Sequence, residues 1–124
     1  MGPVELARWQ WSDYASFHRD RVSLALHLIT VPLFWLSLLA VASWPWHGSW
    51  LAFSLALVAV PAVFAAQGIG HKREALPPKP FTSPGNALAR LVMEQLVTFP
   101  RFLISGQVFR RRQQGAADAA RGKA

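Results

Sequence analysis

The chain has 124 residues, of which 52% are hydrophobic and 15% charged, with no cysteine and a formal net charge of +7. This length suits one domain, and the lack of cysteine excludes disulfides, thiolate metal ligands and cysteine nucleophiles. Soluble domains carry about 25% charged residues, so the low charge indicates contact with lipid. The basic residues stand at the ends of apolar runs rather than in a stripe, which argues against nucleic acid as a partner.

Residues 4–17 predict a short amphipathic helix. Its aromatic side suits the bilayer interface and consists of Trp9, Trp11, Tyr14 and Phe17. The charged segment His18-Arg19-Asp20-Arg21 predicts a break after this helix. Because about twenty mostly polar or aromatic residues precede the first apolar run, we do not expect a cleaved secretory signal.

Two apolar runs follow, residues 22–42 and 49–67, and neither contains Lys, Arg, Asp or Glu. As helices they are long enough to cross the hydrocarbon core of a bilayer, about 30 Å. Pro32 and Pro61 predict kinks rather than helix ends. Trp44 to Gly48 predict a turn between the runs. Gly68-Ile69-Gly70 are expected to close the second span and to allow close helix approach.

The distribution of Lys and Arg predicts the orientation of this hairpin. The turn between the spans has none, whereas Arg8, Arg19 and Arg21 precede the first span and Lys72 and Arg73 follow the second. By the positive-inside rule, both ends of the hairpin are expected on the cytoplasmic side. We therefore expect an integral protein of the bacterial inner membrane with both termini cytoplasmic.

After a Pro-rich loop over residues 75–86, residues 87–109 predict a third helix, bent by Pro100. One face of this helix is polar and carries Arg90, Glu94, Thr98, Arg101 and Ser105. The Arg110-Arg111-Arg112 cluster would violate the positive-inside rule if the helix crossed. We expect it to lie in the interface or beside the hairpin, and its polar face suggests a homo-oligomer.

The predicted fold is thus a small all-α membrane bundle. Two transmembrane helices form a hairpin, with amphipathic helices at the N- and C-terminal ends, in a single domain over residues 1–112. Residues 113–124 are expected to be disordered by composition.

Three of the four histidines fall on the predicted cytoplasmic side: His18, His27 and His71. His27 lies inside the first span, where an ionisable residue is costly and usually functional. On one continuous helix, positions 18 and 27 would face opposite sides, since a helix turns about 100° per residue. The predicted break allows them to meet. His47 lies in the opposite turn and is expected to be an interfacial loop residue.

Taken singly, His18 suits an ordinary interfacial residue and His71 a helix C-terminal cap. Together with His27 they predict a metal site with an open position for Fe(II), Zn or Mn. Glu74 follows His71 by three residues and is expected to join the ligands, to orient one of them, or to form a salt bridge with Lys72, Arg73 or a lipid-facing Arg. Tyr14 is expected either to donate a hydrogen bond to a bound ligand or to anchor the interface.

These residues resemble a family of small membrane proteins that includes the endoplasmic-reticulum 2-hydroxy fatty acid dioxygenase of phytosphingosine degradation and short bacterial relatives. The likeness covers about residues 8 to 105 and rests on Tyr14-x-x-x-His18-x8-His27-x4-Pro32, then Gly70-His71-x-x-Glu74-x-x-x-Pro78, then Phe81 and Pro84. This chain departs from the family at Ser23, where an Asn is frequent, and in the shorter spacing from His71 to Glu74.

The resemblance implies an Fe(II)-dependent dioxygenase that uses O2 to shorten a 2-hydroxy fatty acid by one carbon, giving an aldehyde. It implies His18, His27 and His71 as iron ligands, with Glu74 and Tyr14 in catalytic roles. The substrate carboxylate would pair with Arg19, Arg21 or the Arg90 and Arg101 face.

Two other readings of the histidines stay open. In a non-enzymatic membrane scaffold or assembly protein, they would be packing or interface residues. In a haem-binding membrane protein, they would be axial ligands and the purified protein would be coloured.

Overall fold

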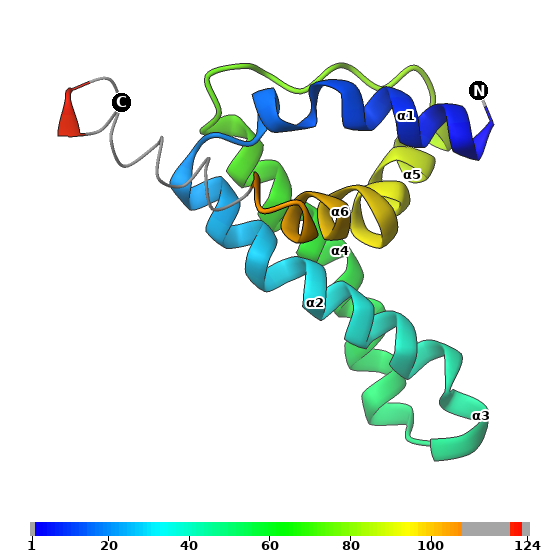
Figure 1. The fold of residues 1–124 in the computed structure, drawn as a ribbon. Helices are drawn as coiled ribbons and strands as arrows, with labels where there is room; N and C mark the ends of the chain where they lie inside the picture. The colour runs from blue at the N-terminus through cyan, green and yellow to red at the C-terminus, as the bar shows by residue number, and fades with distance from the viewer. Residues whose placement is uncertain (1, 108–119, 123–124) are drawn as a thin grey trace.

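The computed structural model describes residues 2–107 and 120–122, and within these ranges it contains helices, turns and loops but no strand. Figure 1 shows a long hairpin, formed by α2 (Arg21–Ala42) and α4 (Trp50–Lys72), whose far end projects alone. A cap of α1 (Pro3–Asp13), α5 (Pro84–Met93) and α6 (Phe99–Ile104) packs at its other end. The predicted all-α bundle is confirmed. The Arg110–Arg112 cluster and most of the predicted disordered tail lie outside the described residues.

The N-terminal segment ends in a break, as predicted. A 3-10 turn, η1 (Tyr14–Phe17), follows α1, and residues 18–20 leave the helical path. The Asp20 carboxylate then caps α2 by accepting the Ser23 N–H at 3.0 Å. The break reverses the chain, so that His18 and His27 can face the same point.

The hairpin turn is tight. Its short helix α3 (Trp44–His47) ends at Gly48, whose positive φ of 62° is the left-handed conformation that glycine adopts easily. His47 accepts the Ser49 N–H at Nδ1, at 2.9 Å, and donates from Nε2 to the Ala40 carbonyl, at 2.8 Å. It therefore stabilises the turn.

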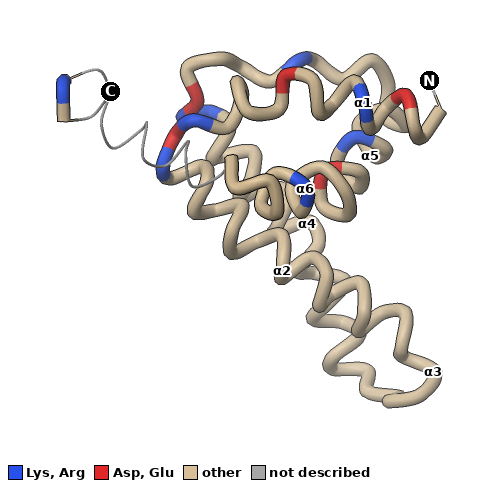
Figure 2. Tube along the Cα trace, in the orientation of Figure 1, with Lys and Arg blue, Asp and Glu red and all other residues tan. Residues whose placement is uncertain are grey.

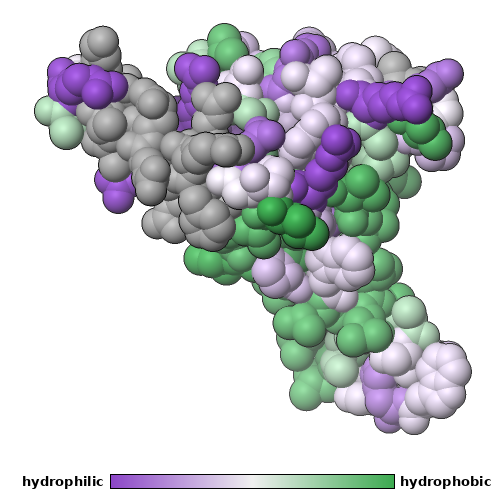
Figure 3. Space-filling model, viewed as in Figure 1, coloured by the Kyte–Doolittle hydropathy of each residue, from purple (hydrophilic) through white to green (hydrophobic). Residues whose placement is uncertain are grey.

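Both hairpin helices are long and apolar enough to cross a membrane. Only 33% of the most apolar window of α2 and 17% of that of α4 is buried, whereas a core helix of a soluble protein would be mostly buried. The hydrophobic surface covers the projecting half of the hairpin (Figure 3), and the charged residues gather at the capped end (Figure 2). This exposed apolar surface indicates a membrane protein with the hairpin in the bilayer.

The second apolar helix continues past its predicted end at residue 67 to Lys72. The two glycines that were expected to close it are helical, and Gly70 packs against α2. A Cβ atom on Gly70 would stand 3.2 Å from both Cα and Oγ of Ser23. The glycine therefore serves close helix contact, as expected, and helix termination was the wrong inference.

The prediction of one helix over residues 87–109 is wrong in its bounds and in its regularity. The segment starts at Pro84, where Ser83 caps α5 by accepting the Asn86 N–H at 3.0 Å. It then passes through a π-helical turn, η2 (Glu94–Thr98), and ends at Ile104. Pro100 explains the irregularity, because it lacks an N–H and clashes with the carbonyl four residues earlier.

This C-terminal segment packs beside the hairpin, one of the two arrangements expected. The Trp35 indole N–H of α2 donates to the Gln95 carbonyl at 2.9 Å, and Gln67 of α4 and Gln95 exchange amide hydrogen bonds at 2.9 and 2.7 Å. Glu94 and Thr98 on its polar face are buried, and Thr98 donates to Gln10 of α1. Because the same chain covers much of this face, its polarity no longer requires a second copy.

Candidate metal centre

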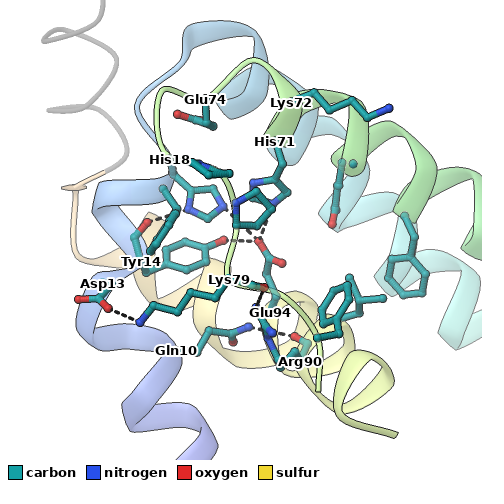
Figure 4. Close-up of a pocket in the computed structure, with 18 of the residues that line it drawn as sticks. Gln10, Asp13, Tyr14, His18, His71, Lys72, Glu74, Lys79, Arg90 and Glu94 are labelled. Carbon is teal, nitrogen blue, oxygen red and sulfur yellow. Dashed lines mark hydrogen bonds and ion pairs between the residues drawn. The ribbon is translucent and has the colours of Figure 1, made fainter. Parts of the chain in front are cut away.

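Three histidines and one glutamate converge where the cap meets the hairpin, and Figure 4 labels His18, His71 and Glu94 of this set. His18 follows η1, His27 lies early in α2, His71 lies near the end of α4, and Glu94 opens the π-helical turn. The Glu94 Oε1 atom is 3.2 Å from Nε2 of His18, 3.1 Å from Nε2 of His27 and 4.0 Å from Nε2 of His71. One ligand atom from each residue lies within 4.8 Å of the others.

Two of the imidazoles are held by their second nitrogen. Nδ1 of His18 is 2.7 Å from the Tyr14 carbonyl oxygen, and Nδ1 of His27 is 2.8 Å from the Ser23 carbonyl oxygen. A carbonyl can only accept, so each Nδ1 must carry the proton and donate. In the neutral tautomer each Nε2 is then a bare lone pair.

Those lone pairs point at another acceptor, the Glu94 carboxylate. Two lone pairs at 3.1 and 3.2 Å from a carboxylate oxygen repel it unless a positive charge lies between them. Either protons on both imidazoles or a metal cation would supply that charge. Imidazoles that donate one N–H to a backbone carbonyl and present the other nitrogen are the usual arrangement of metal ligands.

Glu94 is held in its ionised form. Burial favours the neutral acid, but hydrogen bonds from His18 and His27 in their protonated forms outweigh it and hold the pKa of the Glu94 carboxyl well below its usual range. The Tyr14 hydroxyl donates to the same Oε1 atom at 2.8 Å. Burial, and then the charge of Glu94, raise the pKa of Tyr14 well above its usual range, so the hydroxyl keeps its proton.

The spacing of the four groups fits one ion. Ligands about 2.1 Å from a metal stand roughly 3.0 to 3.4 Å apart at neighbouring corners of an octahedron or tetrahedron. The distances of Glu94 to His18 and His27 match that range, and His71 stands slightly farther out. The buried cluster of His18, His27, His71 and Glu94 can therefore hold a metal ion.

His71 differs from the other two ligands. Its side chain is 18% exposed, and its Nδ1 atom is buried without a partner among the described residues. No carbonyl fixes its ring, so His71 is the ligand with the most freedom to turn.

A cavity of about 510 Å³ reaches the cluster from one side. His18, His71 and Glu94 line it, whereas His27 lies outside the lining. Its walls come from α1, the end of α4, the loop after α4 and α5. Apolar and aromatic residues dominate, and the charged ones are Asp13, Lys72, Glu74, Lys79, Arg90 and Glu94.

The structure brings together part of the predicted site. Tyr14, His18, His27 and His71 meet as expected, but Glu74 stands apart from the ligand cluster. Its carboxylate accepts the Arg19 N–H at 2.9 Å and the Asp20 N–H at 3.0 Å, so it holds the break that follows His18. Its predicted ion pair with Lys72 or Arg73 is not formed among the described residues, and Arg73 instead pairs with Asp20 at 3.2 Å.

Of the four arginines expected to bind substrate, one lines the cavity. The Arg90 guanidinium donates to the Lys79 and Pro80 carbonyls at 2.8 and 2.9 Å and lies over the rings of Trp9 and Phe81. Arg101 lies over the Trp11 ring at 4.1 Å. Arg19, Arg21 and Arg101 lie outside the cavity lining.

Glu94 was not predicted as a ligand from the sequence. A signal was present, because Glu94 is the only acidic residue between Glu74 and Asp118 and lies in a largely apolar stretch. An isolated carboxylate in such a segment requires a positive partner on folding. The pattern placed it on a polar face with arginines, which made a surface role the simpler prediction.

Comparison with models of known families, with curated proteins and with solved structures finds no match.

Proposed function

We propose that this protein is a membrane-bound, Fe(II)-dependent oxygenase that acts on 2-hydroxy fatty acids and shortens them by one carbon. The observation that carries the proposal is the pair of carbonyl-tethered imidazoles, His18 and His27, whose free nitrogens face the Glu94 carboxylate. Nitrogen and carboxylate ligands of this kind suit Fe(II), and a four-residue set leaves positions for substrate and O2 in an octahedron.

The ligand spacing favours a single ion over a haem. All four ligand atoms lie within 4.8 Å of one another, on one small centre. A haem would need axial ligands on opposite faces of a macrocycle, with space around the iron for its ring. The same four buried groups are hard to explain in a scaffold, where apolar residues would pack as well without buried charge.

The cavity suits an amphipathic acid. Asp13 pairs with Lys79 at 2.6 Å, Glu74 binds backbone N–H groups, and Glu94 faces the histidines. The positive charges of Lys72 and Arg90 therefore remain without an acidic ion-pair partner among the described residues that line the cavity. A carboxylate is favoured there, and the apolar walls accommodate a hydrocarbon chain.

The iron, Tyr14 and the walls of the cavity would have separate roles in the reaction. A bound iron would supply the activation of O2 and a Lewis-acid anchor for the 2-hydroxyl group of the substrate. Tyr14 keeps Glu94 oriented through its hydroxyl, and α1, α5 and the loop 73–83 form walls of the cavity that leads to the cluster. The C1–C2 bond of the substrate would break and C1 would leave as CO2. The two electrons and two protons released would pass to O2, giving hydrogen peroxide and an aldehyde one carbon shorter.

We place this site at the cytoplasmic face of a bacterial inner membrane. The charged residues gather at the capped end of the hairpin, and the turn at the other end carries no Lys or Arg (Figure 2). The positive-inside rule then puts the cap and the metal centre on the cytoplasmic side. A fatty acid in that leaflet would present its carboxylate at the depth of the cap.

The test is O2 consumption by iron-loaded protein in lipid nanodiscs, with 2-hydroxyhexadecanoic acid as substrate and hexadecanoic acid as the matched control. We expect O2 uptake, and a product one carbon shorter by mass spectrometry, only with the 2-hydroxy acid and only when Glu94 is intact. Stoichiometric iron without O2 uptake on either acid would overturn the oxygenase and leave a metal-binding membrane protein.

A further inference from the structure

Gly68 is a helical glycine that packing does not explain. It lies inside α4, where glycine weakens a helix because it restricts the backbone least in the unfolded chain. Gly70, two residues on, is explained by its close contact with Ser23. A Cβ atom at Gly68 would meet nothing within 4 Å, and Gly68 lines the cavity. The missing side chain therefore adds space to the cavity.

The residues of α4 that line the cavity form one stripe along the helix: Phe64, Gln67, Gly68, His71 and Lys72. Their spacing of three and four residues puts them on the same face. From His71 to Phe64 the stripe runs about 10 Å along the axis, at about 1.5 Å per residue. The cavity thus extends from the metal centre along a membrane-spanning helix, toward the apolar half of the hairpin.

Helix α5 adds one apolar side chain to the lining. Leu91 of α5 lines the cavity, and Leu88, one turn earlier, is 60% exposed. Gln67 does not reduce the space, because its amide is buried and bonded to Thr30 and Gln95 at 2.9 Å each. Along α4, the cavity thus runs from the ligand cluster and Lys72 at one end to the apolar side chain of Phe64 at the other.

We infer that the absence of a side chain at Gly68 makes room for the hydrocarbon tail of the ligand. The tail passes Gly68, lies between α4 and α5, and extends toward the bilayer. The inference rests on the proposed function for the identity of the headgroup, an acid held near the metal centre. The substrate then enters the cavity laterally from the bilayer, with its carboxylate near the metal centre and its tail toward the lipid. A side chain at Gly68 would block the tail without replacing any metal ligand.

The test is photolabelling in lipid nanodiscs with hexadecanoic acid that carries a mid-chain diazirine, performed without turnover. Gly68→Leu fills the space, Gly68→Ala fills it in part, and Ala65→Leu introduces the same side chain at an exposed position of α4 outside the cavity lining. Metal content and monodispersity are measured on each sample, so that a folding or metal defect is seen separately.

We expect labelling of Gly68→Leu to fall roughly tenfold or more, because exclusion of two methylenes from an apolar site weakens binding by about that factor. Gly68→Ala should fall less, and Ala65→Leu should label like the parent, all with parental metal content. Equal labelling of Gly68→Leu and parent, or no labelling of the parent, would overturn the inference. Loss of metal from every sample with the labelling pattern intact would overturn the proposed oxygenase alone.

Discussion

Gly70 of α4 lies so close to Ser23 of α2 that a Cβ atom on the glycine would be 3.2 Å from the serine Cα. This contact brings the two membrane helices together at the level of the metal centre. The rings of His27 and His71, one on each helix, have centroids 5.1 Å apart. The helix contact therefore controls the spacing of two ligands.

Gly70→Val should separate the helices and destabilise the protein. Overpacking of a close contact costs about 1–3 kcal/mol, and the apparent melting temperature in detergent, followed by circular dichroism, should fall. Gly68→Val is the matched control on the same helix, since nothing lies within 4 Å of its Cβ position. Equal melting of the Gly70 and Gly68 variants would show that the contact is not tight.

Glu94→Gln should abolish tight metal binding, because it removes the anionic ligand that faces the three histidines. We expect the affinity to drop by at least about 100-fold, more than is typical for a residue that only orients a ligand. The measurement is competition against a chelator of known affinity.

Glu74→Gln is the matched control for Glu94→Gln. It distinguishes a carboxylate that binds metal from one that binds backbone N–H groups. Glu74 binds the backbone N–H groups of Arg19 and Asp20, so its neutralisation should cost about 1–3 kcal/mol of stability and leave metal bound. Metal loss from Glu74→Gln, with Glu94→Gln unaffected, would restore Glu74 as the ligand expected from the sequence.

Tyr14→Phe should lower metal affinity about tenfold, since it deletes the hydroxyl that donates to Glu94 Oε1. The ring should stay in place, because it stacks on His18 with centroids 3.8 Å apart and contacts Phe102 edge-on at 5.3 Å. Chelator competition and thermal melting together check this. Unchanged affinity would assign the tyrosine to packing alone.

The orientation in the membrane can be tested by labelling, since the chain has no native cysteine. In intact bacterial cells, Ser49→Cys at the hairpin turn should react with a membrane-impermeant maleimide. Ser12→Cys in α1 should react only after the cells are permeabilised. The reverse pattern would place the metal centre on the outer side.

Local patterns in the sequence were enough to predict the hairpin, the break after His18 and the gathering of three histidines. Charge-free apolar runs of about twenty residues are typical of transmembrane helices, and Lys and Arg residues lie at their ends. The break was predicted from the charged segment His18-Arg19-Asp20-Arg21, and the structure adds that Asp20 caps α2 there.

The carboxylate ligand could not be chosen from local patterns. Glu74 is close to His71 in sequence, but its position just after α4 directs it to the backbone of residues 19 and 20. Glu94 reaches His27 across a long stretch of chain, through the packing of the π-helical turn on α2. Neither that packing nor the extra residue of a π turn has a local sequence signature, apart from Pro100.

The most direct test of the metal centre is elemental analysis of protein purified anaerobically in mild detergent, beside a variant with His18, His27 and His71 all replaced by Ala. We predict near one metal ion per chain in the parent, with iron as the metal, and none in the variant. Parent and variant that are equally folded and equally free of metal would contradict the metal centre and the function proposed from it.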